Sequence, residues 1–444
     1  MSKYFGTDGL RAKAGEFPLD YDSLYIIGQI LTEIFEERGI KKNVLIGKDT
    51  RESGSWIEAS LCSGIKSKNG KVYLAGIIPT SAICYLTRKF NFSAGISISA
   101  SHNPYEDNGI KIFGSDGIKI EDEIEEEIEK RLIERKRSKI KREEIIEDKK
   151  FSSEYFNFLK KVGEGLNGDN LKIVVDCANG AASNFAPILF SELGFDVIPI
   201  NNNPDGKNIN YRCGSLFPGS LSKEATSKGA IFGIAYDGDS DRAIWVDKDG
   251  EIFDGDHTLL IQAKYLKDKL ISPFIIGTVM SNLGLEIALK KYGFKLIRTP
   301  VGDKYVLQEM RKRKSKLGGE QSGHTIFLDI LPTGDGIVTT IQMLKVIVAE
   351  KKSLKELSSD MEKFPQILVN VKVKEKKPLN ELPEIVNIEE KIKKEIGKRG
   401  RILLRYSGTE PKLRIMIEGE NEEKIKDWAE EIASAVKNTL GDEK

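Results

Sequence analysis

The sequence predicts an α/β fold in which three α/β domains precede a smaller α+β domain. A chain of 444 residues is too long for one ordinary hydrophobic core, so we expect several domains. Runs of apolar, β-branched residues alternate with helical patterns, and several end in aspartate or glycine-rich turns, as strands do in βαβ units. We therefore expect strands within residues 43–50, 71–77, 94–100, 172–180, 196–200, 230–239 and 273–279.

Changes in this pattern divide the chain into domains. The segment 120–146 is rich in charge, but an apolar residue recurs at helical spacing from Ile120 to Leu132. Its acidic residues precede its basic ones, which suits the helix dipole, so we expect a solvated helix that closes the first domain. Beyond residue 366, three apolar runs around a charged helical stretch predict the α+β domain. The expected domains span residues 1–150, 151–252, 253–365 and 366–444.

The composition excludes several classes of protein. Lys and Arg total 69 and Asp and Glu total 68, so the net charge of +1 does not suggest binding to nucleic acid or to a membrane surface. No window reaches the ~18 apolar residues of a membrane span. The four cysteines are scattered without a CxxC pair, which argues against a disulfide or zinc framework. We expect a cytoplasmic protein whose partner is a small molecule.

The stretch "SISASHNP" ends a predicted strand with serines at alternate positions. If the strand continues, Ser97, Ser99 and Ser101 share one face, and Pro104 ends the ladder because proline cannot donate to it. Ser101 then lies where a strand enters a loop, which is where α/β sheets bind ligands. A hydrolase nucleophile is a poor alternative, because there is no G-x-S-x-G elbow and the side chain of His102 should diverge from that of Ser101.

The stretch "YDGDSDR" places three carboxylates at alternate positions after a strand. Asp237, Asp239 and Asp241 can converge on one side, as an oxygen-preferring Mg²⁺ requires. A calcium EF-hand does not fit, since Arg242 stands where that loop needs glycine. A polar turn with chance aspartates stays open, although three close carboxylates repel one another unless something binds them.

Two further loops are candidates for binding a sugar phosphate. In "LGGEQSGH", Glu320, Ser322 and His324 are suited to a sugar-reading loop, but an ordinary glycine-rich turn is an open alternative. In "RYSGTEPKLR", guanidinium groups, hydroxyl groups and exposed amides form the kind of cradle that holds a phosphate. An ordinary turn beside a surface arginine remains possible there too. The residues of this cradle are Arg405, Ser407, Gly408, Thr409 and Arg414.

Five motifs in order resemble the α-D-phosphohexomutase family over nearly the whole chain. They are "FGTDGLR", "SASHNP", "DGDSDR", "GEQSGH" and "RYSGTEP". Gln321 and "TPVGDKYV" are similar to the branch that acts on glucosamine phosphates. The resemblance implies mixed sheets around a central cleft, with the C-terminal domain binding phosphate. This chain departs from the usual family pattern at Ala12, Phe217 and Ser240, where glycine, histidine and glycine are common.

The resemblance assigns roles position by position. Ser101 matches the phosphoserine, and its phosphate would join Asp237, Asp239 and Asp241 as ligands of one Mg²⁺ per chain. The other residues that match catalytic positions are Arg11, Lys111, Arg242 and His324, with Lys111 and His324 as candidates for proton transfer. Those that match substrate-binding positions are Glu320, Ser322, Arg405, Ser407, Gly408, Thr409 and Arg414.

The resemblance also implies a reaction. An isomerase of this type would interconvert glucosamine 6-phosphate and glucosamine 1-phosphate, in the biosynthesis of UDP-N-acetylglucosamine. The phosphoryl group of Ser101 would pass to the sugar, with glucosamine or glucose 1,6-bisphosphate as intermediate or activator. Glucose or mannose phosphates are the alternative substrates within the same family. A homodimer is compatible with the resemblance, whereas nucleic-acid and membrane partners are not expected.

Overall fold

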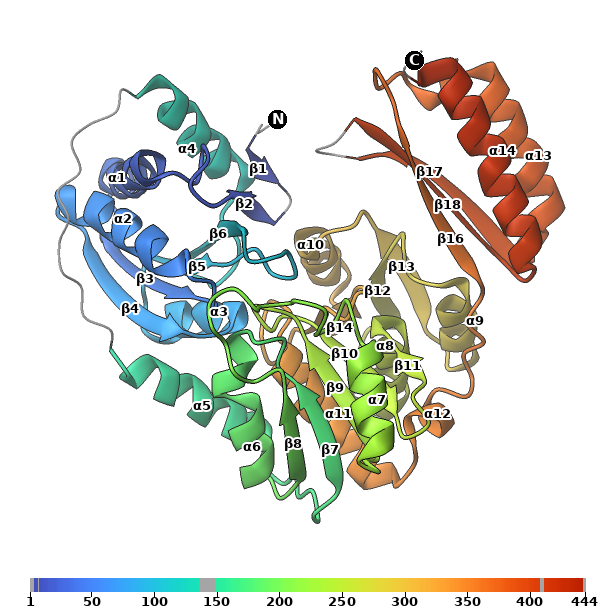
Figure 1. The fold of residues 1–444 in the computed structure, drawn as a ribbon, viewed down its shortest axis with the longest axis horizontal. Coiled ribbons are helices and arrows are strands. Elements are labelled where there is room, and N and C mark those ends of the chain that lie inside the picture. The colour runs from blue at the N-terminus through green and yellow to red at the C-terminus, as the bar shows by residue number, and fades with distance from the viewer. Residues whose placement is uncertain (1–3, 7, 136–147, 408–410, 442–444) are drawn as a thin grey trace.

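The computed structural model describes residues 4–6, 8–135, 148–407 and 411–441, and it contains four sheets that follow one another along the chain (Figure 1). Each of the seven apolar runs contains a strand, which confirms the α/β fold class with mixed sheets and a small C-terminal domain. The positions of the domain boundaries stay predictions. Among the described residues, no helix combines the length and apolar character needed to cross a membrane.

The first sheet contains the strand that leads to Ser101. Its strand order is β1-β2-β6-β5-β3-β4, with β3 parallel to β4 and β5, and the other pairs antiparallel. The strands are β1 (Phe5–Gly6), β2 (Gly9–Lys13), β3 (Asn43–Lys48), β4 (Lys71–Ile77), β5 (Ala94–Ile98) and β6 (Asp107–Gly114). The helices are α1 (Tyr21–Glu37), α2 (Gly54–Ser67), α3 (Thr80–Lys89) and α4 (Asp122–Glu134).

Helix α4 differs from the solvated helix that the sequence predicts. One side of it packs on the first domain, where Ile128 and Leu132 are buried, and two of its acidic residues are buried as well. Glu129 accepts hydrogen bonds from the backbone N–H groups of Tyr4 and Phe5, so it anchors the first strand. Residues 136–147 of the predicted helix lie outside the described residues.

The second sheet, in the order β11-β10-β9-β7-β8, carries the three aspartates. Strand β7 is parallel to β8 and β9, whereas β10 is antiparallel to its neighbours. Its strands are β7 (Lys172–Asp176), β8 (Asp196–Ile200), β9 (Phe232–Tyr236), β10 (Ala243–Asp247) and β11 (Ile252–Phe253). Its helices are α5 (Lys150–Val162), η1 (Ala181–Asn184), α6 (Ala186–Glu192) and α7 (Gly219–Ser227).

The third sheet, in the order β13-β12-β14-β15, carries the "GEQSGH" loop between its last two strands. Its strands are β12 (Phe274–Thr278), β13 (Lys295–Thr299), β14 (Leu317–Gly319) and β15 (Thr325–Phe327). The helical segments are α8 (Gly255–Tyr265), η2 (Lys267–Lys269), α9 (Leu283–Lys291), α10 (Asp303–Arg313), α11 (Gly336–Glu350) and α12 (Leu354–Leu357).

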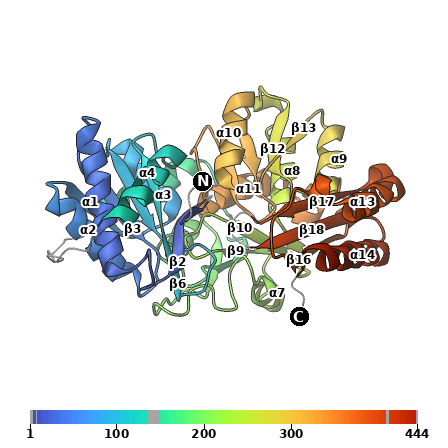
Figure 2. The ribbon, with the colours of Figure 1, turned by 90° about the horizontal axis from the view of Figure 1, so that it is seen from above.

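The fourth sheet is a separate antiparallel sheet, in the order β16-β18-β17. Two long helices cover its outer face, so that the strands face the rest of the molecule (Figures 1 and 2). Its strands are β16 (Gln366–Lys372), β17 (Gly400–Tyr406) and β18 (Lys412–Gly419). Its helical segments are η3 (Leu379–Glu381), α13 (Pro383–Ile396), η4 (Gly397–Arg399) and α14 (Glu422–Leu440).

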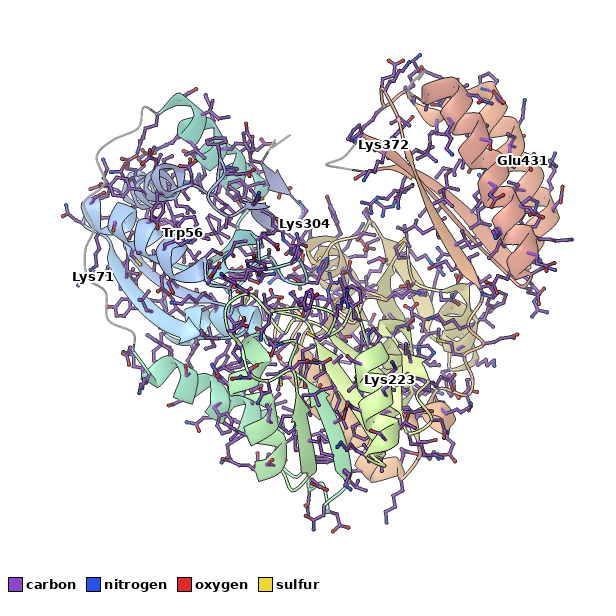
Figure 3. The ribbon with its side chains drawn as sticks, viewed as in Figure 1. Trp56, Lys71, Lys223, Lys304, Lys372 and Glu431 are labelled. Atoms are coloured by element: carbon purple, nitrogen blue, oxygen red, sulfur yellow. The ribbon has the colours of Figure 1, made fainter. Side chains whose placement is uncertain are left out.

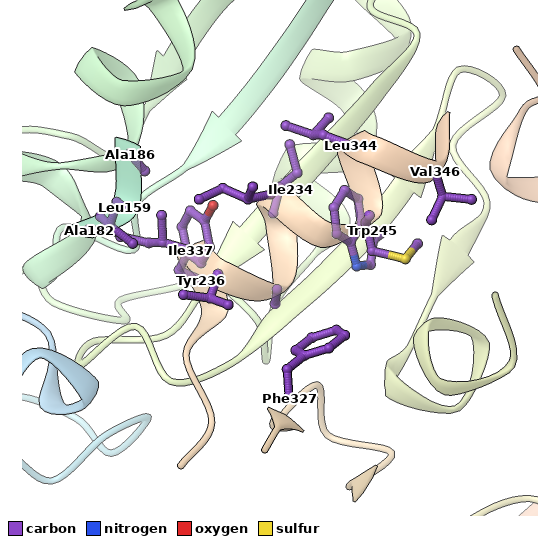
Figure 4. Packing of buried hydrophobic residues seen from close by; sticks show 14 of the residues in the cluster. Leu159, Ala182, Ala186, Ile234, Tyr236, Trp245, Phe327, Ile337, Leu344 and Val346 are labelled. Atoms are coloured by element: carbon purple, nitrogen blue, oxygen red, sulfur yellow. The ribbon is translucent and has the colours of Figure 1, made fainter. Parts of the chain in front are cut away.

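The first three domains share apolar packing. Helix α11 of the third domain packs beside β9 and β10, where Ile337 and Leu344 meet the buried rings of Tyr236 and Trp245 (Figure 4). Polar contacts join the first and third domains as well. Lys304, which lies between these domains in Figure 3, forms an ion pair with Asp122 at 2.9 Å.

Candidate active site

Ser101 lies in a tight loop just beyond strand β5, where the sequence predicts that the strand enters a loop, although the alternation of the strand does not continue to Ser101. The strand ends at Ile98, and Ser101 takes φ 52°, a left-handed conformation that costs a non-glycine residue about 1–2 kcal/mol. The Oγ of Ser99 accepts a hydrogen bond from the backbone N–H of Ser101 at 2.9 Å. This turn ends the alternation and directs the buried hydroxyl of Ser101 toward the second domain.

His102 lies closer to Ser101 than the sequence argument allows. Its Nδ1 is 3.3 Å from the Oγ of Ser101, because the left-handed turn at Ser101 brings together side chains that diverge along a strand. Burial, with the nearby charges of Arg242 and Arg11, lowers the pKa of His102 to about 3. The imidazole is therefore neutral near pH 7 and does not repel a cation at this position.

Three buried carboxylates meet the hydroxyl of Ser101. Asp237, Asp239 and Asp241 follow strand β9, and one carboxylate oxygen from each lies within 4.8 Å of the others. The Oγ of Ser101 donates to Oδ2 of Asp237 at 2.6 Å. Ser240, between the last two aspartates, takes φ 62°, a conformation that glycine adopts without strain.

The donor set and its unfilled hydrogen-bonding capacity fit a divalent cation. Among the described residues, Oδ1 of Asp239 and Oδ1 of Asp241 are buried without a hydrogen-bond partner. Burial and the neighbouring carboxylates raise the pKa of Asp237 well above its usual range. Buried, mutually repelling carboxylates with free oxygen atoms are what a hard cation satisfies.

Lys111 partly neutralises this cluster from the first domain. Its Nζ on strand β6 lies 2.8 Å from Oδ1 of Asp8, 3.5 Å from Asp241 and 3.7 Å from Asp239. Burial alone would lower the pKa of Lys111, but these three carboxylates outweigh it and raise the pKa above the usual lysine value. At Asp239 burial alone would raise the pKa, but Lys111, Thr80 and Arg11 together outweigh burial and keep the pKa of that carboxyl below its usual range.

The two predicted arginines approach the cluster from different domains. Arg11, on strand β2, pairs with the carboxylate of Asp8. The Nε of Arg242 lies 3.9 Å from Oδ1 of Asp241 and 4.0 Å from Oδ2 of Asp237. Burial alone would lower the pKa of Arg242, but the negative charges of Asp237, Asp241 and Glu320 outweigh burial and raise it.

Arg242 also connects the aspartate loop to the "GEQSGH" loop. An isolated antiparallel bridge joins the backbones of Arg242 and His324. His324 is buried, and within the described part of the chain neither of its ring nitrogens has a hydrogen-bond partner. A Cβ on Gly334 would lie 2.4 Å from Nε2 of His324, so glycine at that position makes room for the ring.

Glu320 and Ser322 line a cavity of about 810 Å³ that three domains share. The backbone N–H of Gly302 donates to Oε1 of Glu320 at 2.9 Å, and the Oγ of Ser322 lies 3.5 Å from the other carboxylate oxygen. Leu216 of the second domain and Glu422 of the fourth line the same cavity. The size and the mixed lining suit a ligand as large as a sugar phosphate.

The predicted phosphate cradle lies on the C-terminal domain, apart from the aspartate cluster. Arg405 and Arg414 are directly opposite each other on strands β17 and β18, and Nη2 of Arg414 lies 3.4 Å from the Oγ of Ser407. Burial, with the like charge of Arg414, lowers the pKa of Arg405. Two adjacent guanidinium groups attract an anion. Gly408 and Thr409 lie outside the described residues.

Four polar residues that hold this site together are not predicted from the sequence. Asp8 holds Lys111, and Thr80 donates to Oδ2 of Asp239 at 2.7 Å. Arg51 and Asn210 both hold the Ser101 loop. Asp8 lies inside the "FGTDGLR" motif, and Thr80 follows the predicted strand 71–77. These positions alone indicate only weakly that the two residues belong to the site. Arg51 and Asn210 bind backbone carbonyl groups of the Ser101 loop, and no pattern in the sequence indicates such contacts.

Models of the phosphoglucomutase/phosphomannomutase family match four successive parts of the chain. Its α/β/α domains I, II and III match residues 2–139, 153–250 and 254–364, and its C-terminal domain matches residues 368–435. Relatives named phosphoglucosamine mutase are 45% identical in Caldicellulosiruptor bescii, over 99% of this chain and 100% of the relative, and 45% identical in Myxococcus xanthus, over 99% and 97%. The chain belongs to the α-D-phosphohexomutase family.

Solved structures show the same phosphohexomutase fold. A phosphoglucomutase/phosphomannomutase family protein from Burkholderia thailandensis has a TM-score of 0.80 at 22% identity, covering 99% of this chain and 98% of its own. The N-acetylphosphoglucosamine mutase of Aspergillus fumigatus, solved with GlcNAc-6P and magnesium, has a TM-score of 0.69 at 18% identity, covering 98% and 95%. At these identities the likeness concerns the fold alone.

Proposed function

We propose that this phosphohexomutase is an isomerase that interconverts glucosamine 6-phosphate and glucosamine 1-phosphate. One observation carries the chemistry: the hydroxyl of Ser101 donates to Asp237 at 2.6 Å, inside a buried group of three carboxylates. A serine in this environment is suited to hold a phosphoryl group beside a cation. The choice of glucosamine rests on full-length relatives that are 41–45% identical and are named phosphoglucosamine mutase.

The proposed reaction moves one phosphoryl group at a time. The bond between phosphorus and the Oγ of phosphorylated Ser101 breaks as a free sugar hydroxyl forms its own bond to phosphorus, which gives a bisphosphate. After the bisphosphate turns over, its other phosphoryl group returns to Ser101. His324 and Lys111 are the groups proposed for proton transfer: the sugar hydroxyl loses a proton and the departing Oγ of Ser101 gains one, and Lys111, whose raised pKa keeps it protonated, would be a donor. Arg11 and Arg242 offset the negative charge. Most of the catalysis is positioning and electrostatic stabilisation.

Mg²⁺ is the proposed cofactor, one per chain. Asp237, Asp239 and Asp241 would hold it, together with an oxygen of the Ser101 phosphate. Their unpartnered oxygens support this assignment, as does the magnesium complex of the Aspergillus fumigatus enzyme. Bound there, the cation would stabilise the charge on the phosphoryl group in transfer. Lys111 would contribute a positive charge beside two of the same carboxylates.

The remaining predicted residues would bind the sugar and its second phosphate. Glu320 and Ser322 would contact sugar hydroxyls, since both line the shared cavity. Glucose 1,6-bisphosphate, found in a complex of a serine-to-alanine variant of the Aspergillus fumigatus enzyme, supports a bisphosphate as intermediate or activator. The cytoplasmic location and a homodimer remain part of the proposal. The residues proposed for the non-reacting phosphate are Arg405, Ser407, Gly408, Thr409 and Arg414.

A coupled assay with three substrates tests this function. Purified protein is given glucosamine, glucose or mannose 6-phosphate with Mg²⁺ and a trace of bisphosphate, and each 1-phosphate is measured. We expect the largest kcat/KM with glucosamine 6-phosphate and slow turnover of glucose 6-phosphate. A preference for glucose or mannose phosphate would replace the proposed substrate by the alternative within the family. No turnover of any of the three would contradict the proposed function itself.

A further inference from the structure

Two buried side chains from different domains bind the same two carbonyl groups of the Ser101 loop. Nη2 of Arg51 donates to the backbone oxygens of Ser101 at 3.1 Å and Asn103 at 2.6 Å. Nδ2 of Asn210 donates to the same oxygens at 2.9 Å and 3.0 Å. Arg51 is 2% exposed and Asn210 is 8% exposed, so solvent offers these carbonyl groups little alternative. The Ser101 loop is therefore held by hydrogen bonds from both the first and the second domain.

Arg51 is itself fixed by the first domain. It follows strand β3 and pairs with the carboxylate of Asp49, and both side chains are fully buried. The same carboxylate accepts a hydrogen bond from the Oγ of Ser99, and that oxygen accepts from the backbone N–H of Ser101. The N–H and the C=O of Ser101 are thus both tied to one buried ion pair. This arrangement offsets the cost of the left-handed conformation at Ser101.

Asn210 supplies the corresponding hold from the second domain. It takes φ 58° in the segment between β8 and α7, and its backbone N–H donates to the carbonyl oxygen of Ala178 at 2.9 Å. The aspartate loop of the same domain packs directly against it. A Cβ on Gly238 would lie 2.7 Å from the carbonyl oxygen of Ser101 and 2.9 Å from Nδ2 of Asn210. Asn210 thus joins the Ser101 loop to the domain that carries Asp237.

We propose that Arg51 and Asn210 are positioning residues that together set the place of the Ser101 hydroxyl relative to the three aspartates. Neither side chain contacts the hydroxyl; both act through the backbone carbonyl groups of Ser101 and Asn103. This inference rests on the proposed function. Phosphoryl transfer needs the donor and acceptor oxygens in line, and a displacement of about 1 Å lowers such a rate by roughly a hundredfold. We call Arg51 and Asn210 the clamp residues. Loss of either one therefore slows phosphoryl transfer and leaves the binding of the sugar phosphate largely unchanged.

The test compares Asn210→Ala, Asn210→Asp and Arg51→Lys with a matched control, Asn43→Ala. Asn43 makes hydrogen bonds at the opposite end of the same sheet, with the backbone of Asn91 and Ser93. Asn210→Asp keeps the shape of the side chain but removes the donor. Arg51→Lys keeps the charge beside Asp49 but loses the fork in which Nη1 pairs with Asp49 while Nη2 reaches the two carbonyl groups.

We expect kcat to fall roughly 10- to 100-fold in the three clamp variants, with KM for glucosamine 6-phosphate within about threefold of the wild type. The ³¹P resonance of phosphorylated Ser101 should shift or broaden in each of them. Asn43→Ala should keep the wild-type kcat and resonance, and thermal unfolding should identify any variant that does not fold.

Three outcomes would overturn the proposal: an unchanged kcat and resonance in Asn210→Asp and Arg51→Lys, a loss confined to KM, or an equal loss of kcat in Asn43→Ala. Failure of the proposed function is distinguishable, because the wild type would then show no turnover. If only Arg51→Lys folds poorly, the isosteric Asn210→Asp still decides the matter.

Discussion

The first three domains and the C-terminal domain differ in how they are packed. In the first three, one continuous group of buried apolar side chains includes Leu45 of the first domain, Trp245 of the second and Phe327 of the third. The C-terminal domain has a separate core, in which Ile415 and Ile432 are buried between its sheet and helices. Close packing across domains resists relative movement, whereas a domain that shares no apolar core with its neighbours depends on its interface contacts to stay in place.

Polar contacts attach the C-terminal domain to the third. Arg401 donates to the backbone oxygens of Val279 at 2.8 Å and Ser281 at 2.5 Å, and it pairs with the buried Glu418. Glu418 in turn accepts from the backbone N–H of Leu283 at 2.7 Å. The comparison teaches that the groups proposed to react are held in one rigid frame, whereas the groups proposed to hold the second phosphate lie on an independently packed domain.

The largest expected effect concerns the metal site within the rigid frame. Asp239→Ala should lower turnover by roughly a thousandfold, because it removes a proposed ligand and one of the carboxylates that Lys111 contacts. Chelation of the wild type should stop activity and added Mg²⁺ should restore it, as measured by initial rates. Asp247→Asn is the control, because Asp247 caps a turn at the other end of β10. Full activity of the chelated enzyme would contradict the metal assignment.

A smaller effect is expected at the sugar loop. Glu320→Ala should lose roughly 2–4 kcal/mol of transition-state stabilisation, because hydrogen bonds from the sugar to a charged carboxylate are lost. The hydroxyl groups proposed for Glu320 are common to glucose and glucosamine, so kcat/KM should fall similarly for both phosphates. Glu309→Ala, on helix α10 of the same domain, should leave both values unchanged. Loss of activity with glucosamine phosphate alone would show that Glu320 reads the amine.

A change on the separately packed C-terminal domain should act mainly on binding. Arg405→Ala should raise KM by roughly tenfold, the value of one charge-assisted hydrogen bond, because the cradle loses one of two guanidinium groups. The kcat should change less, since the reacting groups lie in the other region. Lys426→Ala, on the outer helix α14, is the matched loss of positive charge. A fall in kcat with unchanged KM would instead connect this domain to the transfer step.

The smallest expected effect concerns the third-domain segment on which the C-terminal domain is attached. Asp256, buried beneath the segment that Arg401 contacts, accepts from the backbone N–H of Asn282 at 2.7 Å. Burial and the charge of Asp254 raise its pKa to about 8. The folded state therefore keeps a proton that the unfolded state has lost between about pH 4 and pH 8, so this group lowers stability as the pH rises through that window.

Asp256→Asn should remove that dependence, because the amide keeps an acceptor for Asn282 and does not ionise. The gain in melting temperature over the wild type should be larger at pH 8 than at pH 5. A difference that is constant with pH would show that Asp256 does not bind the proton.

The sequence predicted the parts of the fold and site that depend on local pattern. The seven strands follow from apolar, β-branched runs. Strand β6 was missed because Asp, Asn and Gly stand among its apolar residues, and β10 was missed although its five residues are as apolar as those of the predicted strands. The aspartate cluster follows from alternate spacing beside a strand. The left-handed turn at Ser101 was not predictable, because it depends on tertiary contacts from Arg51 and Asn210 rather than on the serine itself.

The central claim is that Ser101 carries the phosphoryl group that is transferred. Protein labelled with ³²P by glucose 1,6-bisphosphate is mixed with unlabelled glucosamine 6-phosphate and quenched at times shorter than one turnover. We expect the label on the Ser101 peptide to appear in sugar bisphosphate at a rate no slower than kcat, and the folded Ser101→Ala variant to take up no label and to lack turnover. Near-wild-type turnover by Ser101→Ala, or label that stays on the protein while product accumulates, would contradict the account.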